Sequence, residues 1–222
     1  MADPSLITTF DTWLPHQQSN ASDDLILALE AAQALPDNCR VLHRLPVDVD
    51  LAWDAIQIEI AHHRPAYVLA CGMAESRSRL SFELQAISEP AIQACALSAA
   101  ADAAAAPILL GPDAVRRSPV PPAYWQAMGT RWRCAEVSEN AGHFVCNGLY
   151  YRLLDPAFRA SLALPSRGGG QAAETPTEAP TEAQILFVHV PILTPDNREA
   201  LMADFRLLLS RLMAWPGSSP PP

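Results

Sequence analysis

The stretch "AYVLACG", residues 66–72, decides the fold class. It is a continuous apolar run that closes on a glycine, a pattern typical of a strand buried on both faces within a parallel sheet. Other runs also have the composition of strands: "SLITTF" at 5–10, "CRVLHRLPV" at 39–47, "RCAEVS" at 133–138 and "ILFVHVPIL" at 185–193. The sequence therefore predicts a sheet with "AYVLACG" among its buried strands.

Helical patterns lie between these runs. Residues 20–35, "NASDDLILALEAAQAL", offer Asn20 or Ser22 as a helix cap, acidic residues in the first turn and apolar residues at helical spacing. Residues 50–64, "DLAWDAIQIEIAHHR", are amphipathic, and Pro65 ends the helix. Strands that alternate with helices predict a three-layer α/β/α sandwich with a mainly parallel sheet. In such a sheet, reactive residues gather at the carboxyl ends of the strands.

The composition excludes several classes of partner. Half of the 222 residues are hydrophobic, the net charge is −9 and no basic patch stands out, which argues against nucleic acid and anionic membrane surfaces. No apolar run approaches the length of a membrane span, and the first residues do not read as a secretory signal. Five cysteines, an odd number without a CxxC pair, fit a reducing compartment. We therefore expect a cytoplasmic protein without disulfides.

One segment breaks the α/β pattern. Residues 164–184, "LPSRGGGQAAETPTEAPTEAQ", are rich in Gly, Pro, Thr and Glu, which predicts a disordered surface insertion rather than a domain boundary. The end of the chain, residues 216–222, has the composition of a disordered tail. We therefore expect one α/β domain over residues 1–215.

Cys146 is the first candidate for chemistry. It lies in "SENAGHFVCNGLYYRLL", residues 138–154, where a small-residue turn leads into a helical run. The start of a helix presents unpaired N–H groups and positive potential, which lower the pKa of a thiol and can bind an oxyanion. The alternative is a buried packing residue, the more common fate of a cysteine in an apolar run.

Two other residues complete a possible catalytic set. His189 lies within "ILFVHVPIL" on the same face as Phe187 and near the end of the strand, so its ring needs a polar partner or serves a structural role. Glu83 follows the strand that ends at Gly72, and the alternative for it is a carboxylate on a helix surface. Together these residues supply a thiol nucleophile, an imidazole base and a carboxylate that orients the base.

The blocks around these residues resemble the pyroglutamyl peptidase I (pyrrolidone-carboxyl peptidase) family of cysteine peptidases. The counterparts of the family's blocks occur in order: "TTFDTW…NAS", "LPV" at 45–47, "GMAESRSRLSFELQAIS", "SENAGHFVCNGLYY" and "LFVHVPIL". The cysteine block is the most specific, since it keeps the turn, Cys146 and the following Asn147. The resemblance spans nearly the whole chain and implies the phosphorylase/hydrolase-like type of sandwich.

The resemblance assigns a role to each matching position. It implies Cys146 as the nucleophile, His189 as the base and Glu83 as the carboxylate partner. Phe10 and Trp13 match two aromatic residues that help to enclose the pyrrolidone ring, with ordinary packing beneath a loop as the alternative.

Two further positions would complete the substrate pocket. Asn20 matches the loop asparagine and is equally suited to cap a helix. Met73 matches a glutamine whose backbone lies beside the ring. No cofactor and no metal ion are implied, the substrate would be a small peptide, and a homo-oligomer stays open.

Several positions depart from the family pattern. Glu75 and Ser76 replace two glycines, and Leu84 replaces the arginine that follows the catalytic glutamate. A loop that normally follows this block is replaced by alanine-rich sequence. The leading hypothesis is therefore a peptidase that removes N-terminal pyroglutamate through a thioester. A non-catalytic binding protein and a cysteine amidase for another small acyl or lactam group are the alternatives.

Overall fold

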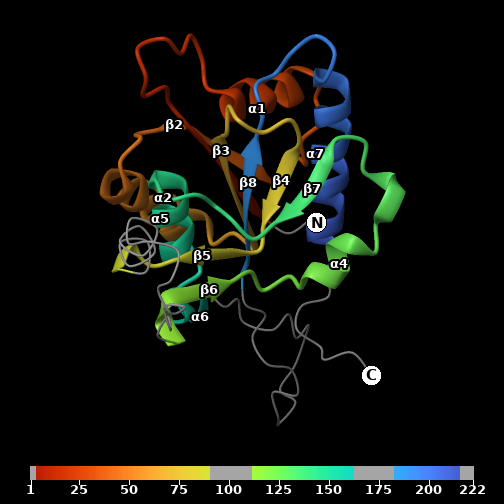
Figure 1. Ribbon diagram of the computed structural model, residues 1–222. Helices are drawn as coiled ribbons and strands as arrows, with labels where there is room; N and C mark the ends of the chain where they lie inside the picture. Colours follow the sequence, from red (N-terminus) through yellow and green to blue (C-terminus); the bar gives the residue numbers. More distant parts are fainter. Residues whose placement is uncertain (1–3, 91–111, 163–182, 216–222) are drawn as a thin grey trace, which may run out of the picture.

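A computed structural model describes residues 4–90, 112–162 and 183–215 of the chain. Within these residues, a six-stranded sheet has the strand order β2-β1-β3-β8-β4-β7 (Figure 1). Its strands are β1 (Ser5–Phe10), β2 (Cys39–Leu45), β3 (Tyr67–Met73), β4 (Leu80–Glu83), β7 (Ala135–Ser138) and β8 (Gln184–Val190). Strands β5 (Gln85–Ile87) and β6 (Val115–Arg117) form a separate antiparallel pair. The strands predicted at 5–10, 39–47, 66–72, 133–138 and 185–193 are all present.

The sheet is mainly parallel, as predicted. Strands β2, β1, β3 and β8 run in one direction, and β4 pairs with β8 in the antiparallel sense. Strand β7 is parallel to β4. Strand β4 was not predicted, and β3 is followed by this strand rather than by a helix. The reason is that "LSFE" is short and turns only two apolar side chains, Leu80 and Phe82, into the core.

Helices cover both faces of the sheet and complete the three layers (Figure 1). One face carries α1 (Ala21–Ala31), α4 (Pro122–Gln126) and α7 (Arg198–Met213). The other face carries α2 (Val49–His63), α5 (Val145–Leu153) and α6 (Pro156–Ser161). Short 3₁₀ turns lie at Pro112–Ala114 and Gly129–Arg131. The predicted α/β/α sandwich is therefore confirmed.

Each helix buries the apolar stripe that its sequence spacing indicates. On α7 the buried residues recur every three or four positions: Leu201, Phe205, Leu208 and Leu212. On α2 they are Ala52, Ile56 and Ile60. Alternation along the strands divides the core in the same way, since Leu69 and Cys71 face α1 while Val68 and Ala70 face α2. His189 consequently faces the same side of the sheet as Phe187 and α5.

Two expectations concern residues outside the described ranges. Most of the expected insertion at 164–184 and the whole expected tail at 216–222 lie there. The expected range extends too far at its end, because Gln184 is the first residue of β8. A single domain over 1–215 stays a prediction. None of the helices in the described ranges is both long and apolar enough to cross a membrane.

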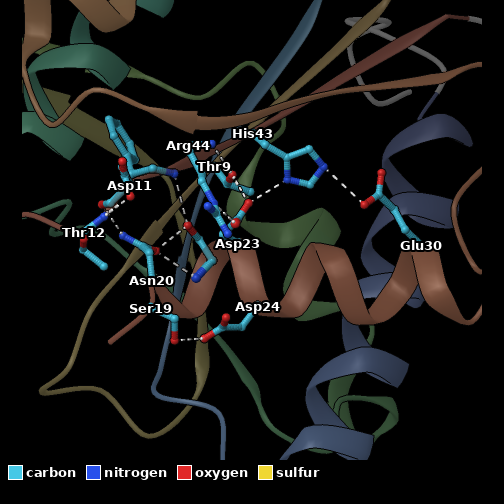
Figure 2. A network of polar contacts seen from close by, with 12 residues as sticks. Thr9, Asp11, Thr12, Ser19, Asn20, Asp23, Asp24, Glu30, His43 and Arg44 are labelled. Atoms are coloured by element: carbon cyan, nitrogen blue, oxygen red, sulfur yellow. Dashed lines mark hydrogen bonds and ion pairs between the residues drawn. The ribbon is translucent and has the colours of Figure 1, made fainter. Parts of the chain in front are cut away.

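A buried carboxylate joins the first strands to the first helix. Asp23, in the first turn of α1, accepts a hydrogen bond from Thr9 Oγ1 at 2.7 Å, and Arg44 Nε lies 2.9 Å from its other oxygen. His43 contacts Asp23 at 2.6 Å through Nδ1 and Glu30 at 3.2 Å through Nε2. Figure 2 shows these side chains converging from β1, β2 and α1. The network therefore fixes the point where the chain leaves β1.

The loop at 11–20 is closed by Asn20. The Asn20 side chain donates to Asp11 O at 3.0 Å and accepts from the backbone N–H of Ser22, which makes Asn20 the cap of α1 (Figure 2). The sequence left a substrate-pocket role and a cap role open for Asn20; the cap is confirmed, and the substrate-pocket role stays a prediction. Because both ends of the loop are tied down, the residues at its tip are held at a defined position.

Replacing Asp23 with Asn tests this network. Burial by itself raises the pKa of Asp23, but hydrogen bonds from His43, Thr9 and Arg44 outweigh it and leave the pKa below the usual 3.8. The network thus contributes stability above the unfolded pKa and loses it as the pH falls through the folded pKa. We expect Asp23→Asn to lower the free energy of unfolding by about 2 kcal/mol at pH 7.

Urea unfolding at several pH values measures this effect. The difference in the free energy of unfolding between wild type and Asp23→Asn should be constant above about pH 5, where Asp23 is ionised in both the folded and the unfolded state. It should shrink below about pH 4, where the carboxylate becomes protonated. Asp24→Asn, on the same turn of α1, removes an equal charge without touching the network and is the control. A difference that persists unchanged at pH 3 would contradict the ionic role of Asp23.

Candidate active site

Cys146 is the second residue of α5 and follows the helix cap, Phe144, by two positions. It is half-buried and lies against the sheet at Gly72. A β-carbon at position 72 would lie 2.8 Å from Cys146 Sγ and 3.0 Å from Phe187 Cζ. The sulfur therefore occupies space that exists because residue 72 has no side chain.

His189 and Glu83 form a buried pair beside this sulfur. His189 Nδ1 lies 2.8 Å from Glu83 Oε1, and the two residues are 5% and 0% exposed. His189 is the strand partner of Gly72 across the β3–β8 ladder. Glu83 reaches the histidine from the end of β4, so the alternative of a carboxylate on a helix surface is wrong.

Arg77 supports the same carboxylate. Its guanidinium Nη2 lies 2.9 Å from Glu83 Oε1 and donates to Asn140 O at 2.6 Å, in the loop that leads to α5. Tyr150, in α5, donates its hydroxyl to the backbone oxygen of Glu83 at 2.8 Å. Among the described residues, Glu83 Oε2 is buried without a hydrogen-bond partner. Both side-chain contacts of the carboxylate, one with an imidazole and one with a guanidinium, therefore involve the same oxygen, Oε1.

Asn147 ties the start of α5 to the strand that follows Glu83. Its side chain accepts from the backbone N–H of Ile87 at 2.9 Å and donates to Ile87 O at 2.7 Å. Because β5 follows β4 after a single residue, this pair of bonds fixes the helix that carries Cys146 relative to the strand that carries Glu83.

One pocket unites most of the predicted site residues. It has a volume of about 300 Å³, and its lining includes six of the seven: Phe10, Trp13, Asn20, Met73, Cys146 and His189. Glu83 lies behind His189. The rings of Trp13 and Phe144, each more than half exposed, meet at this pocket with centroids 4.6 Å apart. The lining is mainly aromatic and aliphatic, and the thiol and imidazole both reach it.

A sequence comparison relates the chain to a known protein family. The model of the pyroglutamyl peptidase family matches residues 5–169, about three quarters of the chain. The chain belongs to the pyroglutamyl peptidase family. The matched range contains Glu83 and Cys146, whereas His189 lies beyond its end and is brought to the site by β8. Membership indicates a peptidase.

Solved structures share the fold. Pyroglutamyl peptidase I from Bacillus amyloliquefaciens is 17% identical, with 97% of each chain covered and a TM-score of 0.65. The pyrrolidone carboxyl peptidase of Thermococcus litoralis is 18% identical, covering 96% of this chain and 94% of that one, with a TM-score of 0.63. That of Fervidobacterium islandicum AW-1 is 19% identical, covering 95% and 98%, with a TM-score of 0.61. The sequence matches no curated protein.

The thiol differs from the sequence-based expectation. Burial raises the pKa of Cys146 to about 12, and the nearby Glu83 adds to the rise. The backbone N–H of Cys146 and the charge of Arg77 act in the opposite direction but are outweighed. No hydrogen bond joins Cys146 Sγ to His189 within the described parts of the chain. The resting sulfur is thus a neutral thiol, and the helix start does not by itself make it a thiolate.

Several residues at the pocket were not predicted from the sequence. Phe144 caps the helix that carries Cys146, and an aromatic residue two positions before a candidate nucleophile was an available signal. The space-making role of Gly72 and the pocket position of Gln17 had no sequence signal. Over the described ranges, no cluster of three or more His, Cys, Asp or Glu residues is arranged to hold a metal ion.

Replacing Gly72 with Ala tests the packing of the sulfur. The new methyl group would displace Cys146 Sγ, so we expect alkylation of Cys146 and any thiol-dependent hydrolysis to fall by on the order of 10- to 100-fold. The free energy of unfolding should also fall, and by less in a Cys146→Ala background, which removes the sulfur but keeps the Phe187 contact. An equal cost in both backgrounds would show that the sulfur does not define this space.

Alkylation across pH tests the protonation state of Cys146. Because burial holds the thiol pKa near 12, its reaction with iodoacetamide should accelerate continuously from pH 6 to pH 10. A thiolate formed in advance would give a plateau near neutral pH. Peptide mass spectrometry can follow each cysteine separately, and the fully buried Cys71 reports any unfolding.

Proposed function

We propose that this protein is a cysteine peptidase that removes an N-terminal pyroglutamyl residue from small peptides. The observation that supports it most directly is the 2.8 Å contact between His189 Nδ1 and Glu83, made by a histidine that lines the same pocket as Cys146. Since Nδ1 is engaged, Nε2 is the nitrogen left to exchange a proton with the thiol.

The reaction would begin with a coupled proton transfer. His189 takes the proton from Cys146 as the sulfur attacks the carbonyl carbon that joins pyroglutamate to the next residue. A neutral resting thiol requires this general-base assistance. The N–H groups at the start of α5, which no side chain of the cap residue satisfies, would stabilise the developing oxyanion. His189 then returns the proton to the leaving amine, and water hydrolyses the thioester.

The pocket suits a small ring without charge on its faces. Phe10 closes its inner wall, and Trp13 with Phe144 forms an aromatic rim against which a five-membered lactam can stack. Met73 and Asn20 also line the pocket, where polar groups of the backbone can meet the lactam. A pocket of this size selects the acyl group and leaves the rest of the peptide outside.

Hydrolysis of a pyroglutamyl-coupled fluorophore under reducing conditions tests the proposal. We expect wild-type activity, a loss of several orders of magnitude in Cys146→Ser and in His189→Gln, and a smaller loss in Glu83→Gln. Cys39→Ser removes a free thiol far from the pocket and should retain activity. A folded wild-type protein without turnover would refute the proposal and favour a binding protein or another acyl substrate.

The described cysteines, Cys39, Cys71, Cys134 and Cys146, are all free thiols. We infer from them a reducing, cytoplasmic location, where a thiol nucleophile stays active. A homo-oligomer stays a prediction.

A further inference from the structure

Glu75 introduces a carboxylate into the candidate substrate pocket. It lies just after β3 and lines the same pocket as Cys146, Trp13 and Phe144. Among the described residues that line this pocket, it is the one carboxylate, and no Lys or Arg accompanies it there. A neutral lactam does not require such a group, so the carboxylate needs another explanation.

The position of Glu75 is fixed from the opposite loop. Gln17 Nε2 donates to Glu75 Oε1 at 2.8 Å, and Gln17 Oε1 accepts from the backbone N–H groups of Trp13 and Leu14 at 3.0 and 3.1 Å. His16, an exposed side chain, lies 3.5 Å from the same Glu75 oxygen. Within the described chain, Glu75 Oε2 makes no hydrogen bond or ion pair. One oxygen therefore holds the carboxylate in place, and the other is left for a ligand.

The surroundings of Glu75 favour a cation. The side chain is 40% exposed, and the half-exposed aromatic rings of Trp13 and Phe144 line the same pocket. A carboxylate beside aromatic faces is a combination that binds ammonium and guanidinium groups. A neutral ligand seated there would strip water from the carboxylate without replacing it, at a cost in free energy.

We propose that Glu75 makes the enzyme select substrates that place a positively charged, N–H-bearing group beside the pocket. This inference rests on the proposed peptidase function and narrows its substrate class. The cation can come from two sources. One is a basic side chain on the residue that follows pyroglutamate. The other is the acyl group itself, as in an N-terminal proline, whose ring has the size of pyroglutamate but carries a protonated amine.

Paired substrates separate the two sources. In the first pair, pyroglutamyl-Lys-Ala is compared with pyroglutamyl-(Nε-acetyl-Lys)-Ala, which differs only in the charge. In the second, a prolyl-coupled fluorophore is compared with its N-acetylprolyl counterpart. We expect the cationic member of one pair to be preferred at least 10-fold in kcat/KM at low ionic strength, and the preference to weaken in high salt.

Glu75→Gln, which removes the charge and keeps the length of the side chain, should abolish that preference. Glu139→Gln removes the same charge from an exposed position in the loop before α5 and should keep the preference. The pair that shows the effect identifies the source of the cation. Equal rates within both pairs, or a preference that survives in Glu75→Gln, would overturn the inference.

A binding assay distinguishes failure of this inference from failure of the proposed function. Protection of Cys146 from iodoacetamide by the same peptides reports occupancy of the pocket without requiring turnover. Stronger protection by the cationic peptide, dependent on Glu75, supports the inference even if nothing is hydrolysed. If the enzyme hydrolyses pyroglutamyl substrates but neither the protection nor the rate depends on the charge of the peptide, the inference is overturned and the peptidase proposal stays intact.

Discussion

The buried carboxylate of Glu83 is the constraint on which the site depends. A carboxylate with no exposed surface is costly unless charged or polar partners surround it, and here His189 and Arg77 both meet its Oε1 within 2.9 Å. These contacts orient the imidazole and draw the loop at Asn140 toward the sheet through Arg77. The proposed base and the approach to the proposed nucleophile are thus arranged by one oxygen atom.

The sheet topology makes this arrangement possible. In an all-parallel sheet, the carboxyl ends of both neighbouring strands would lie next to the carboxyl end of β8. Strand β4 instead runs antiparallel to β8, and its last residue, Glu83, lies opposite Phe187. Glu83 therefore lies two residues back along β8 from His189, on the side away from the pocket. The other neighbour of β8 is β3, where Gly72 pairs with His189 and leaves room for the sulfur. Strand β4 thus supplies the carboxylate that contacts His189, and strand β3 supplies the space for the sulfur of Cys146.

Much of this could be predicted from the sequence, and the exceptions have physical causes. Periodicity identified β3, β8 and the helices that cover them, because long apolar patterns report burial directly. The strand that carries Glu83 was not predicted, although Leu80 and Phe82 alternate with polar residues, because an alternation over four residues is a short signal. The thiol pKa was predicted in the wrong direction, since the helix start was visible in the sequence and the burial of the sulfur was not.

The two halves of the site are held by different side-chain hydrogen bonds, which explains how an unusual pocket wall coexists with the contact between His189 and Glu83. Cys146, His189 and Glu83 are held by α5, β8 and β4, through Asn147 and Arg77. The wall that includes Trp13 and Glu75 is held by the loop at 11–20, which Asn20 and the Asp23 network close from the other side of β1. Because Glu75 shares no side-chain partner with Glu83, a change at Glu75 can alter which ligand the pocket accepts while the groups that would act on it keep their geometry.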